Sequence, residues 1–241
     1  MPEGTRPHVG TTDVDLVIGV ALGDDTPETY ATLQTNLQRS GFSQDQPSFR
    51  WSRQVDGMRV HVEFLCETDE VDDGAIFKPK DGSGTKMAAF NVRGAMLARD
   101  DYVEVELRGE RLDEGGHSKV RLRVANLLPY VVLKVFAFQD RHQNKDAYDL
   151  VFTLLNAEGG PAAAGRRAAA SPVTASRQVE EALTWLAERF ADVGQDGPRA
   201  YANFLASGDD PDESARLRRQ AVASARAFIG GLREAASGEQ A

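Results

Sequence analysis

Two aspartates one residue apart open the first apolar run of the chain. The stretch "TTDVDLVIG" places Asp13 and Asp15 at the start of a segment rich in Val, Leu and Ile, which favours a β-strand. Alternation along a strand puts these two carboxylates on one face, while Val14 and Leu16 project toward the core. At about 6 Å and an effective dielectric constant of about 20, the two charges repel by roughly 3 kcal/mol. Either full solvation or a bound divalent cation must therefore offset the repulsion.

A predicted hairpin supplies a third carboxylate. The stretch "FRWSRQVDGMRVHVEFLC" alternates apolar and polar residues in two arms, joined by the Asp-Gly pair at 56–57 that is typical of a type I′ turn. In the second arm, Glu63 lies on the polar face. Magnesium prefers oxygen ligands, so Asp13, Asp15 and Glu63 form a candidate magnesium site.

Such a carboxylate cluster suits phosphoryl transfer. Metal ions there bridge the carboxylates to a triphosphate and neutralise the charge that develops on the leaving pyrophosphate. Short Asp-x-Asp runs also occur by chance, so a solvated polar strand start is the alternative interpretation of residues 13–15.

A second group of charged residues lies in "VVLKVFAFQDRHQNKDAYDLVFTLL". The pattern predicts two helices, and Lys134 and Arg141 are seven residues apart on one face of the first. Lys145, Asp146 and Asp149 begin the second helix. Taken alone, Lys134 could extend its charge past apolar neighbours to water, and Lys145 with Asp149 could form an exposed ion pair.

The composition limits the class of protein. The net charge of −9 argues against a broad nucleic-acid footprint, and a single cysteine excludes an internal disulfide. The chain has neither an apolar run long enough to span a bilayer nor a secretory signal, so we expect a cytoplasmic protein without a membrane partner. The four histidines show no metal-ligand spacing and are interpreted as ordinary surface or strand residues.

The remaining elements predict a mixed sheet flanked by helices. Thr26 and Pro27 begin an amphipathic helix that Gly41 ends, and residues 67–86 form a polar loop in which "GSGTK" lacks the spacing of a phosphate loop. Two more strands and five helices complete the prediction: strands at 102–109 and 118–126, helices ending near 141 and starting near 144, and helices near 175–191, 198–206 and 211–233. We expect a first domain over 1–158, a Gly/Ala/Pro linker over 159–174 and a helical region over 175–241.

Together these stretches resemble the nucleotidyltransferases of the polymerase-beta superfamily, and most closely the group related to the AbiEii toxins of type IV toxin–antitoxin systems. The resemblance spans roughly residues 8–156. It implies an α/β (α+β) fold, in which a mixed nucleotidyltransferase sheet is flanked by helices and followed by a C-terminal helical region.

The resemblance also implies the site residues. The metal-binding acids fall on Asp13, Asp15 and Glu63, and a catalytic, nucleotide-facing lysine falls on Lys134. The implied nucleotide-binding residues are Gly10, Thr11, Lys134, Arg141, Lys145, Asp146 and Asp149. The Gly-Ser turn that the superfamily places before the aspartates is missing, since Gly4-Thr5 stands too close to them. Three explanations remain open: the chain is truncated, Gly10-Thr11 partly substitutes, or nucleotide affinity is impaired.

The implied function is magnesium-dependent transfer of a nucleoside monophosphate from a nucleoside triphosphate to a hydroxyl of RNA (tRNA) or protein. A role as toxin in a toxin–antitoxin or phage-defence system, with a cognate antitoxin, follows from the same resemblance, and we expect no DNA partner. The alternative is a catalytically impaired protein of the same fold that acts as an interaction partner.

Overall fold

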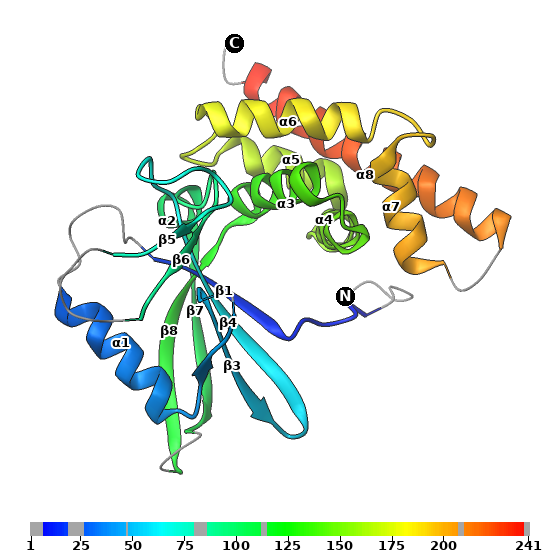
Figure 1. Cartoon of the computed structure of the whole chain (residues 1–241). Coiled ribbons are helices and arrows are strands. Elements are labelled where there is room, and N and C mark those ends of the chain that lie inside the picture. The colour runs from blue at the N-terminus through cyan, green and yellow to red at the C-terminus, as the bar shows by residue number, and fades with distance from the viewer. Residues whose placement is uncertain are drawn as a thin grey trace. The chain divides into compact units, whose positions relative to one another are not determined.

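The chain forms two compact units. The computed structural model describes residues 7–18, 27–46, 48–79, 86–111, 115–206 and 210–238 (Figure 1). Val9–Val124 form one unit, called the sheet unit here, and Met1–His8 with Ala125–Ala241 form the other, called the helical unit. The division thus falls at residue 124 instead of the predicted boundary near 158. The reason is that the two helices after residue 125 pack against later helices of the chain.

The sheet unit contains a mixed six-stranded sheet of order β2-β3-β4-β6-β5, in which β1 also pairs with β4. The strands are β1 (Asp13–Val17), β2 (Ser43–Gln44), β3 (Arg50–Val55), β4 (Met58–Cys66), β5 (Ile76–Phe77) and β6 (Ala89–Asn91). Pairing is parallel for β1–β4 and β4–β6 and antiparallel for β3–β4. The predicted hairpin is confirmed, because Asp56 and Gly57 both have the positive φ angles, 49° and 80°, that a type I′ turn requires.

One face of this sheet carries the core. Helix α1 (Pro27–Arg39) contributes the buried Tyr30, which packs in one cluster with Trp51 and Phe64. The structure confirms the predicted helix and its end at Gly41, whose φ is +75°. The predicted cap residue, Thr26, lies outside the described residues.

The predicted burial of Val14 and Leu16 is wrong. Their side chains are 55% and 38% exposed. Among the described strands β1 pairs with β4 alone, so it lies at an edge of the sheet. The side chains on its core-side face therefore lie at the margin of the core.

The loop predicted over residues 67–86 includes a short strand, β5, and the strand β6 that pairs with it follows at Ala89. Both strands are too short to produce an alternating pattern. Of the "GSGTK" stretch, residues 82–85 lie outside the described residues. The one-turn helix α2 (Leu97–Asp100) then leads to β7 (Tyr102–Glu110) and β8 (His117–Ala125), which form a separate two-stranded sheet. These two strands confirm the prediction.

The helical unit consists of α3 (Leu127–Arg141), α4 (Asn144–Asn156), α5 (Gly160–Ala169), α6 (Arg177–Arg189), α7 (Asp196–Leu205) and α8 (Pro211–Gly238). Five of these six helices match the predicted positions. Within the described residues, no helix combines the length and apolar character that crossing a lipid bilayer requires.

The predicted linker over 159–174 is wrong, because helix α5 occupies most of it. Alanine is the best helix former, and Ala164 and Ala168 bury their side chains. Helices α5 and α8 lie against each other with their backbones in close approach. A Cβ at Gly231 would overlap the carbonyl oxygen of Ala162, and one at Gly165 would overlap the carbonyl oxygen of Phe228.

This close approach predicts opposite effects at two neighbouring glycines. We expect Gly231→Ala to lower the free energy of unfolding by about 1–3 kcal/mol, because the added methyl group forces α5 and α8 apart. Gly230→Ala, whose Cβ meets nothing within 4 Å, should raise it by up to about 1 kcal/mol. Urea denaturation of both variants measures the difference, and equal effects would contradict the close packing.

Candidate functional site

The predicted acidic residues lie together on one face of the sheet unit. In the parallel register of β1 and β4, Asp13 is opposite His61 and Asp15 is opposite Glu63. Residues directly opposite each other on neighbouring strands project to the same face. Asp13, Asp15 and Glu63 therefore share a face, as the alternation of the two strands predicts.

Strand β3 extends this polar face. Its Arg50 is opposite Glu63, so Asp15, Glu63 and Arg50 form one row across three strands. The Nε of Arg50 donates a hydrogen bond to Oε1 of Glu63 at 2.6 Å, and its Nη2 contacts the same oxygen. The sequence interpretation missed Arg50, although counting back from the Asp-Gly turn pairs it with Glu63.

The neighbouring row contains Asp13, His61 and Ser52. Asp45 connects the last two, since Ser52 Oγ donates a hydrogen bond to Asp45 Oδ1 at 2.8 Å and His61 Nδ1 lies 3.5 Å from Asp45 Oδ2. This histidine therefore lies beside a carboxylate on the polar face of the sheet. A phosphate or an acceptor hydroxyl brought to this face would meet both acidic and basic groups.

The donor types suit magnesium, but the side chains do not converge on one point. Asp13 and Asp15 are exposed on an edge strand, whereas the Glu63 carboxylate is 16% exposed and paired with Arg50. The described residues include no group of three or more His, Cys, Asp or Glu side chains that could hold a metal ion. The backbone register fits a three-carboxylate metal site, and the orientation of the Glu63 side chain does not.

The predicted nucleotide-binding residues Gly10 and Thr11 lie just before β1, and both are exposed. Gly10 has a φ of +86°, a conformation that favours glycine. The Thr11 hydroxyl accepts a hydrogen bond from the backbone N–H of Asp13 at 3.2 Å. In the structure Thr11 therefore fixes the backbone at the start of β1.

The other predicted residues belong to the helical unit, where α3 and α4 bring them into one ion cluster, called the α3–α4 cluster below. Asp146 is 2% exposed and accepts two hydrogen bonds from Arg141, Nε to Oδ2 at 2.7 Å and Nη2 to Oδ1 at 2.8 Å. Lys134 Nζ lies 3.5 Å from Asp146 Oδ1. Lys134 and Arg141 thus share one carboxylate, which confirms that they lie on one face of α3.

Asp149 is the second buried carboxylate of the cluster, at 3% exposed. Its Oδ2 accepts hydrogen bonds from Lys134 and Lys145, both at 2.9 Å. The Nε2 of His8 lies 3.1 Å from the other oxygen, Oδ1. The predicted pair of Lys145 and Asp149 is therefore part of a larger buried network and not an isolated surface pair.

His8 was interpreted as an ordinary surface or strand histidine, and its place in this network is a correction. Its ring lies against Tyr148 and Phe152, with centroids 5.2 and 4.9 Å away. Asp149 is 141 positions later in the chain, so no local pattern connects it with His8.

Ion pairing outweighs burial in this cluster. Burial alone would raise the pKa of Asp149, but hydrogen bonds from Lys134 and Lys145 hold that pKa below its usual range. Burial opposes the charge of Lys134, yet Asp149, Tyr130 and Asp146 together raise the pKa of its amine. Both groups are therefore charged at neutral pH, and the cluster contains fixed charges of both signs.

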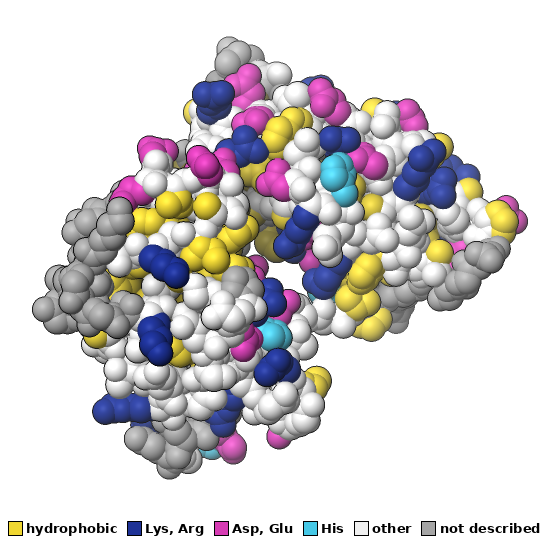
Figure 2. Space-filling model, in the orientation of Figure 1, with side chains coloured by type: hydrophobic (Ala, Val, Ile, Leu, Met, Phe, Trp, Pro, Cys, Tyr) yellow, Lys and Arg dark blue, Asp and Glu magenta, His cyan; other side chains and the backbone are white. Residues whose placement is uncertain are grey.

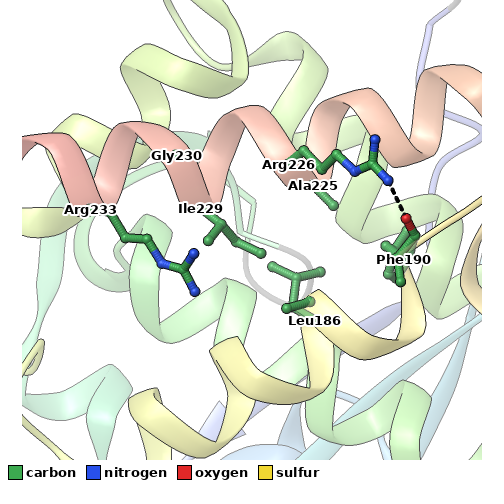
Figure 3. A pocket seen from close by; sticks show the side chains of 9 residues that line it. Leu186, Phe190, Ala225, Arg226, Ile229, Gly230 and Arg233 are labelled. Carbon is green, nitrogen blue, oxygen red and sulfur yellow. Dashed lines mark hydrogen bonds between the residues drawn. The ribbon is translucent and has the colours of Figure 1, made fainter.

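A separate pocket of about 380 Å³ lies between α6 and α8 (Figure 3). Its wall is mostly apolar, with Leu186, Phe190 and Ile229 among the lining residues, and Arg226 and Arg233 line it from α8. Arg226 donates a hydrogen bond to the carbonyl oxygen of Ala191. The pocket contains neither a carboxylate nor a nucleophile, so it is not the candidate catalytic site.

Acidic and basic side chains are interspersed over the face of the molecule that Figure 2 shows. Among the side chains coloured there, no continuous basic surface stands out, which agrees with the net charge of −9. A polynucleotide would need such a surface for extended phosphate contacts.

The chain matches no protein-family model, no curated protein and no solved structure.

The α3–α4 cluster predicts a large cost for removing one cation. We expect Arg141→Ala to lower the free energy of unfolding by about 3 kcal/mol, because it leaves the buried Asp146 carboxylate without its bidentate partner. Arg166→Ala is the control, because it removes an exposed ion pair: the side chains of Arg166 and Glu234 are 52% and 72% exposed. Loss of that pair should lower the free energy of unfolding by less than about 1 kcal/mol. Urea denaturation measures both, and similar values would contradict a buried cluster.

The lowered pKa of Asp149 predicts a pH-dependent difference between the wild type and Asp149→Asn. The folded pKa lies below the ordinary value of 3.8, so the stabilisation is present above 3.8 and is lost as the pH falls through the folded pKa. We expect Asp149→Asn to be less stable by about 2 kcal/mol at neutral pH, with the gap narrowing as the pH falls below 3.8. Denaturation curves at neutral pH and at a series of pH values below 3.8 test this, and a constant gap would contradict it.

Proposed function

We propose that this protein is a magnesium-dependent nucleotidyltransferase. The observation that carries the proposal is the parallel register of β1 and β4, which puts Asp13, Asp15 and Glu63 on one face of adjacent strands. Asp13 and Asp15 put two like charges on one exposed face of the edge strand, which favours a cationic ligand, while Glu63 already has Arg50 as its cationic partner. The resemblance of residues 8–156 to the polymerase-beta superfamily supports the same assignment.

The reaction joins an acceptor hydroxyl to the α-phosphorus of a nucleoside triphosphate. The acceptor oxygen forms the new P–O bond, the bond from the α-phosphorus to the bridging oxygen breaks, and pyrophosphate leaves with that electron pair. A magnesium ion held by Asp13, Asp15 and Glu63 would neutralise the charge that develops on the phosphates. A carboxylate of this polar face can take up the hydroxyl proton, because a charged carboxylate is a hydrogen-bond acceptor.

The proposal requires that Arg50 release the Glu63 carboxylate when the metal ion binds. Its guanidinium now holds the Glu63 carboxylate, so Glu63 must exchange that partner for the metal ion. The Arg50 side chain is 37% exposed and can turn to solvent or to a phosphate of the nucleotide. We assign Arg50 this second position in the loaded enzyme.

Within the helical unit, the predicted nucleotide-binding cations Lys134, Arg141 and Lys145 form a candidate phosphate-binding group of their own. The side chains of Lys145 and Arg141 are 40% and 58% exposed, so phosphate oxygens can reach both while the carboxylates orient them. Lys134 is 21% exposed and is the most enclosed of the three cations. We assign it the role of a fixed positive charge within that group.

The acceptor and the biological role are extensions of the proposal. A hydroxyl of tRNA or of a protein is the acceptor class, and the role is that of a toxin in a type IV toxin–antitoxin or phage-defence system. Both rest on the resemblance to AbiEii-related proteins.

A second candidate function is that of an interaction partner with an impaired catalytic site. The Arg50–Glu63 pair favours it, because a guanidinium that stays in place would exclude metal from Glu63. Calorimetry distinguishes the two candidates. The first requires nucleoside triphosphate binding that depends on magnesium, and the second requires that no such binding occurs.

The proposal predicts the loss of label transfer in two variants. The full chain is incubated with α-labelled nucleoside triphosphates, magnesium, total tRNA and cell lysate. We expect Asp13→Asn and Asp15→Asn each to reduce labelling about 100-fold or more, because each removes one carboxylate charge from the metal site. Asp73→Asn changes an exposed aspartate elsewhere in the same unit and should leave labelling unchanged.

Labelling that persists undiminished in both site variants would exclude these residues as the metal site. If the wild type transfers no label and calorimetry detects no magnesium-dependent binding of a nucleoside triphosphate, these results support the second candidate instead.

A further inference from the structure

The pocket between α6 and α8 exists because small residues line much of it. Ala187, Ala191, Ala225 and Gly230 are among its lining residues. A Cβ at Gly230 would meet nothing within 4 Å, whereas one at the adjacent Gly231 would overlap the backbone of α5. Helix α8 is therefore in close backbone contact with α5, while its Gly230 opens onto the pocket.

The floor of the pocket is apolar and is held in place by packing. Leu186, Phe190 and Ile229 line it, and all three side chains are buried. Closely packed side chains keep one position, so the floor does not have to rearrange for a ligand. The volume of about 380 Å³ lies at the lower end of the range for small-molecule sites, roughly 300–1,000 Å³. The pocket thus suits a small molecule with an apolar body.

Two arginines flank this floor. Arg226, Gly230 and Arg233 are four and then three residues apart, so they lie on one face of α8. Figure 3 shows the Arg233 side chain extending from α8 beside Ile229. Arg226 points toward the other end of the pocket, near Phe190. The pocket is therefore flanked by a cation at each end and is apolar between them.

The two guanidinium groups differ in what they contact. Arg226 donates a hydrogen bond to the carbonyl oxygen of Ala191, which closes that end of the pocket. Arg233 is exposed, and among the residues that the structure describes its guanidinium has no hydrogen-bond or ion-pair partner. The neighbouring Glu234 pairs instead with Arg166. The described lining residues include no carboxylate, so the positive charge of Arg233 is not compensated in the pocket.

We propose that this pocket binds a small aliphatic carboxylate, with the carboxylate group on Arg233 and the chain on the apolar floor. A guanidinium is a planar fork of N–H donors that matches the two oxygens of a carboxylate. The chain would displace water from the space that Gly230 leaves open. This site goes beyond the proposed nucleotidyltransferase function and does not depend on it, because other residues line the pocket.

The dimensions and chemistry of the pocket disfavour other classes of ligand. Nine residues line it, whereas a stable protein–protein interface takes about 20–30 residues from each partner. A nucleotide would place its polar sugar and several phosphate charges over an apolar floor beside a single unpaired cation. An aliphatic carboxylate matches both the floor and the charge of Arg233.

Calorimetric titration of the full chain with sodium octanoate tests the proposal. We expect saturable binding at one site per chain. Octanol has the same chain without the charge, and acetate has the charge without the chain. Each should bind at least about 10-fold more weakly than octanoate, because each keeps only one of the two kinds of contact.

Two variants test the position of the site. Arg233→Gln should raise the dissociation constant about 10-fold or more, because hydrogen bonds between charged groups are lost. Gly230→Leu should abolish binding, because the new side chain fills the open space of the pocket. Arg216→Gln is the matched control and should leave the constant unchanged, since Arg216 also belongs to α8 but lies outside the pocket and is 57% exposed.

Circular dichroism checks that each variant is folded. Arg233 is exposed, so Arg233→Gln tests the proposal even if Gly230→Leu disturbs the packing of α8. Octanoate bound instead to exposed apolar side chains elsewhere, such as Leu107 and Leu122, would bind both pocket variants as tightly as the wild type.

That result would overturn the proposal. So would the absence of saturable octanoate binding by the wild type, or octanol binding as tight as that of octanoate.

Discussion

The register of strand β4 is the constraint on which the sheet unit depends. Its residues pair with β1 on one side and β3 on the other, so its alternation decides which side chains of three strands are buried. Phe64 lies in the core at 0% exposed, and Glu63 next to it lies on the polar face. A slip by one residue would bury the carboxylate and expose the phenylalanine, which makes every other register costly.

Charge compensation is the second physical theme, and both units show it. In the sheet unit Arg50 pairs with Glu63 beside the exposed aspartates of β1. In the helical unit Asp146 and Asp149 are almost fully buried and are stabilised by cations from both α3 and α4. A buried carboxylate without such partners would be protonated or would destabilise the fold, so these pairings explain why the charges are tolerated.

The difference between the two clusters bears on function. The α3–α4 cluster is complete within its own unit, because each carboxylate has at least two cationic partners at 3.5 Å or less. On the sheet, Asp13 and Asp15 share an exposed edge strand with apolar neighbours that are themselves exposed. The first arrangement suits a rigid framework of fixed charge, and the second leaves two carboxylates accessible from solvent.

The sequence by itself determined most elements and the pairing of charges within them. Period-two alternation predicted the β3–β4 hairpin, and helical spacing predicted that Lys134 and Arg141 share a face, because both patterns act over a few residues. The sequence was wrong about the linker, since residues 160–169 form a helix whose small residues allow α8 to lie close against it. It was also wrong about Val14 and Leu16, because an edge strand looks the same in sequence as a central one.

Only the tertiary structure decided which distant residues meet. The contact of His8 with Asp149 joins positions 141 apart, and no local pattern encodes it. The same holds for the pairing of β1 with β4, which puts three carboxylates from two strands on one polar face. Local periodicity sets the face on which a side chain lies, whereas packing of the whole chain sets which faces come together.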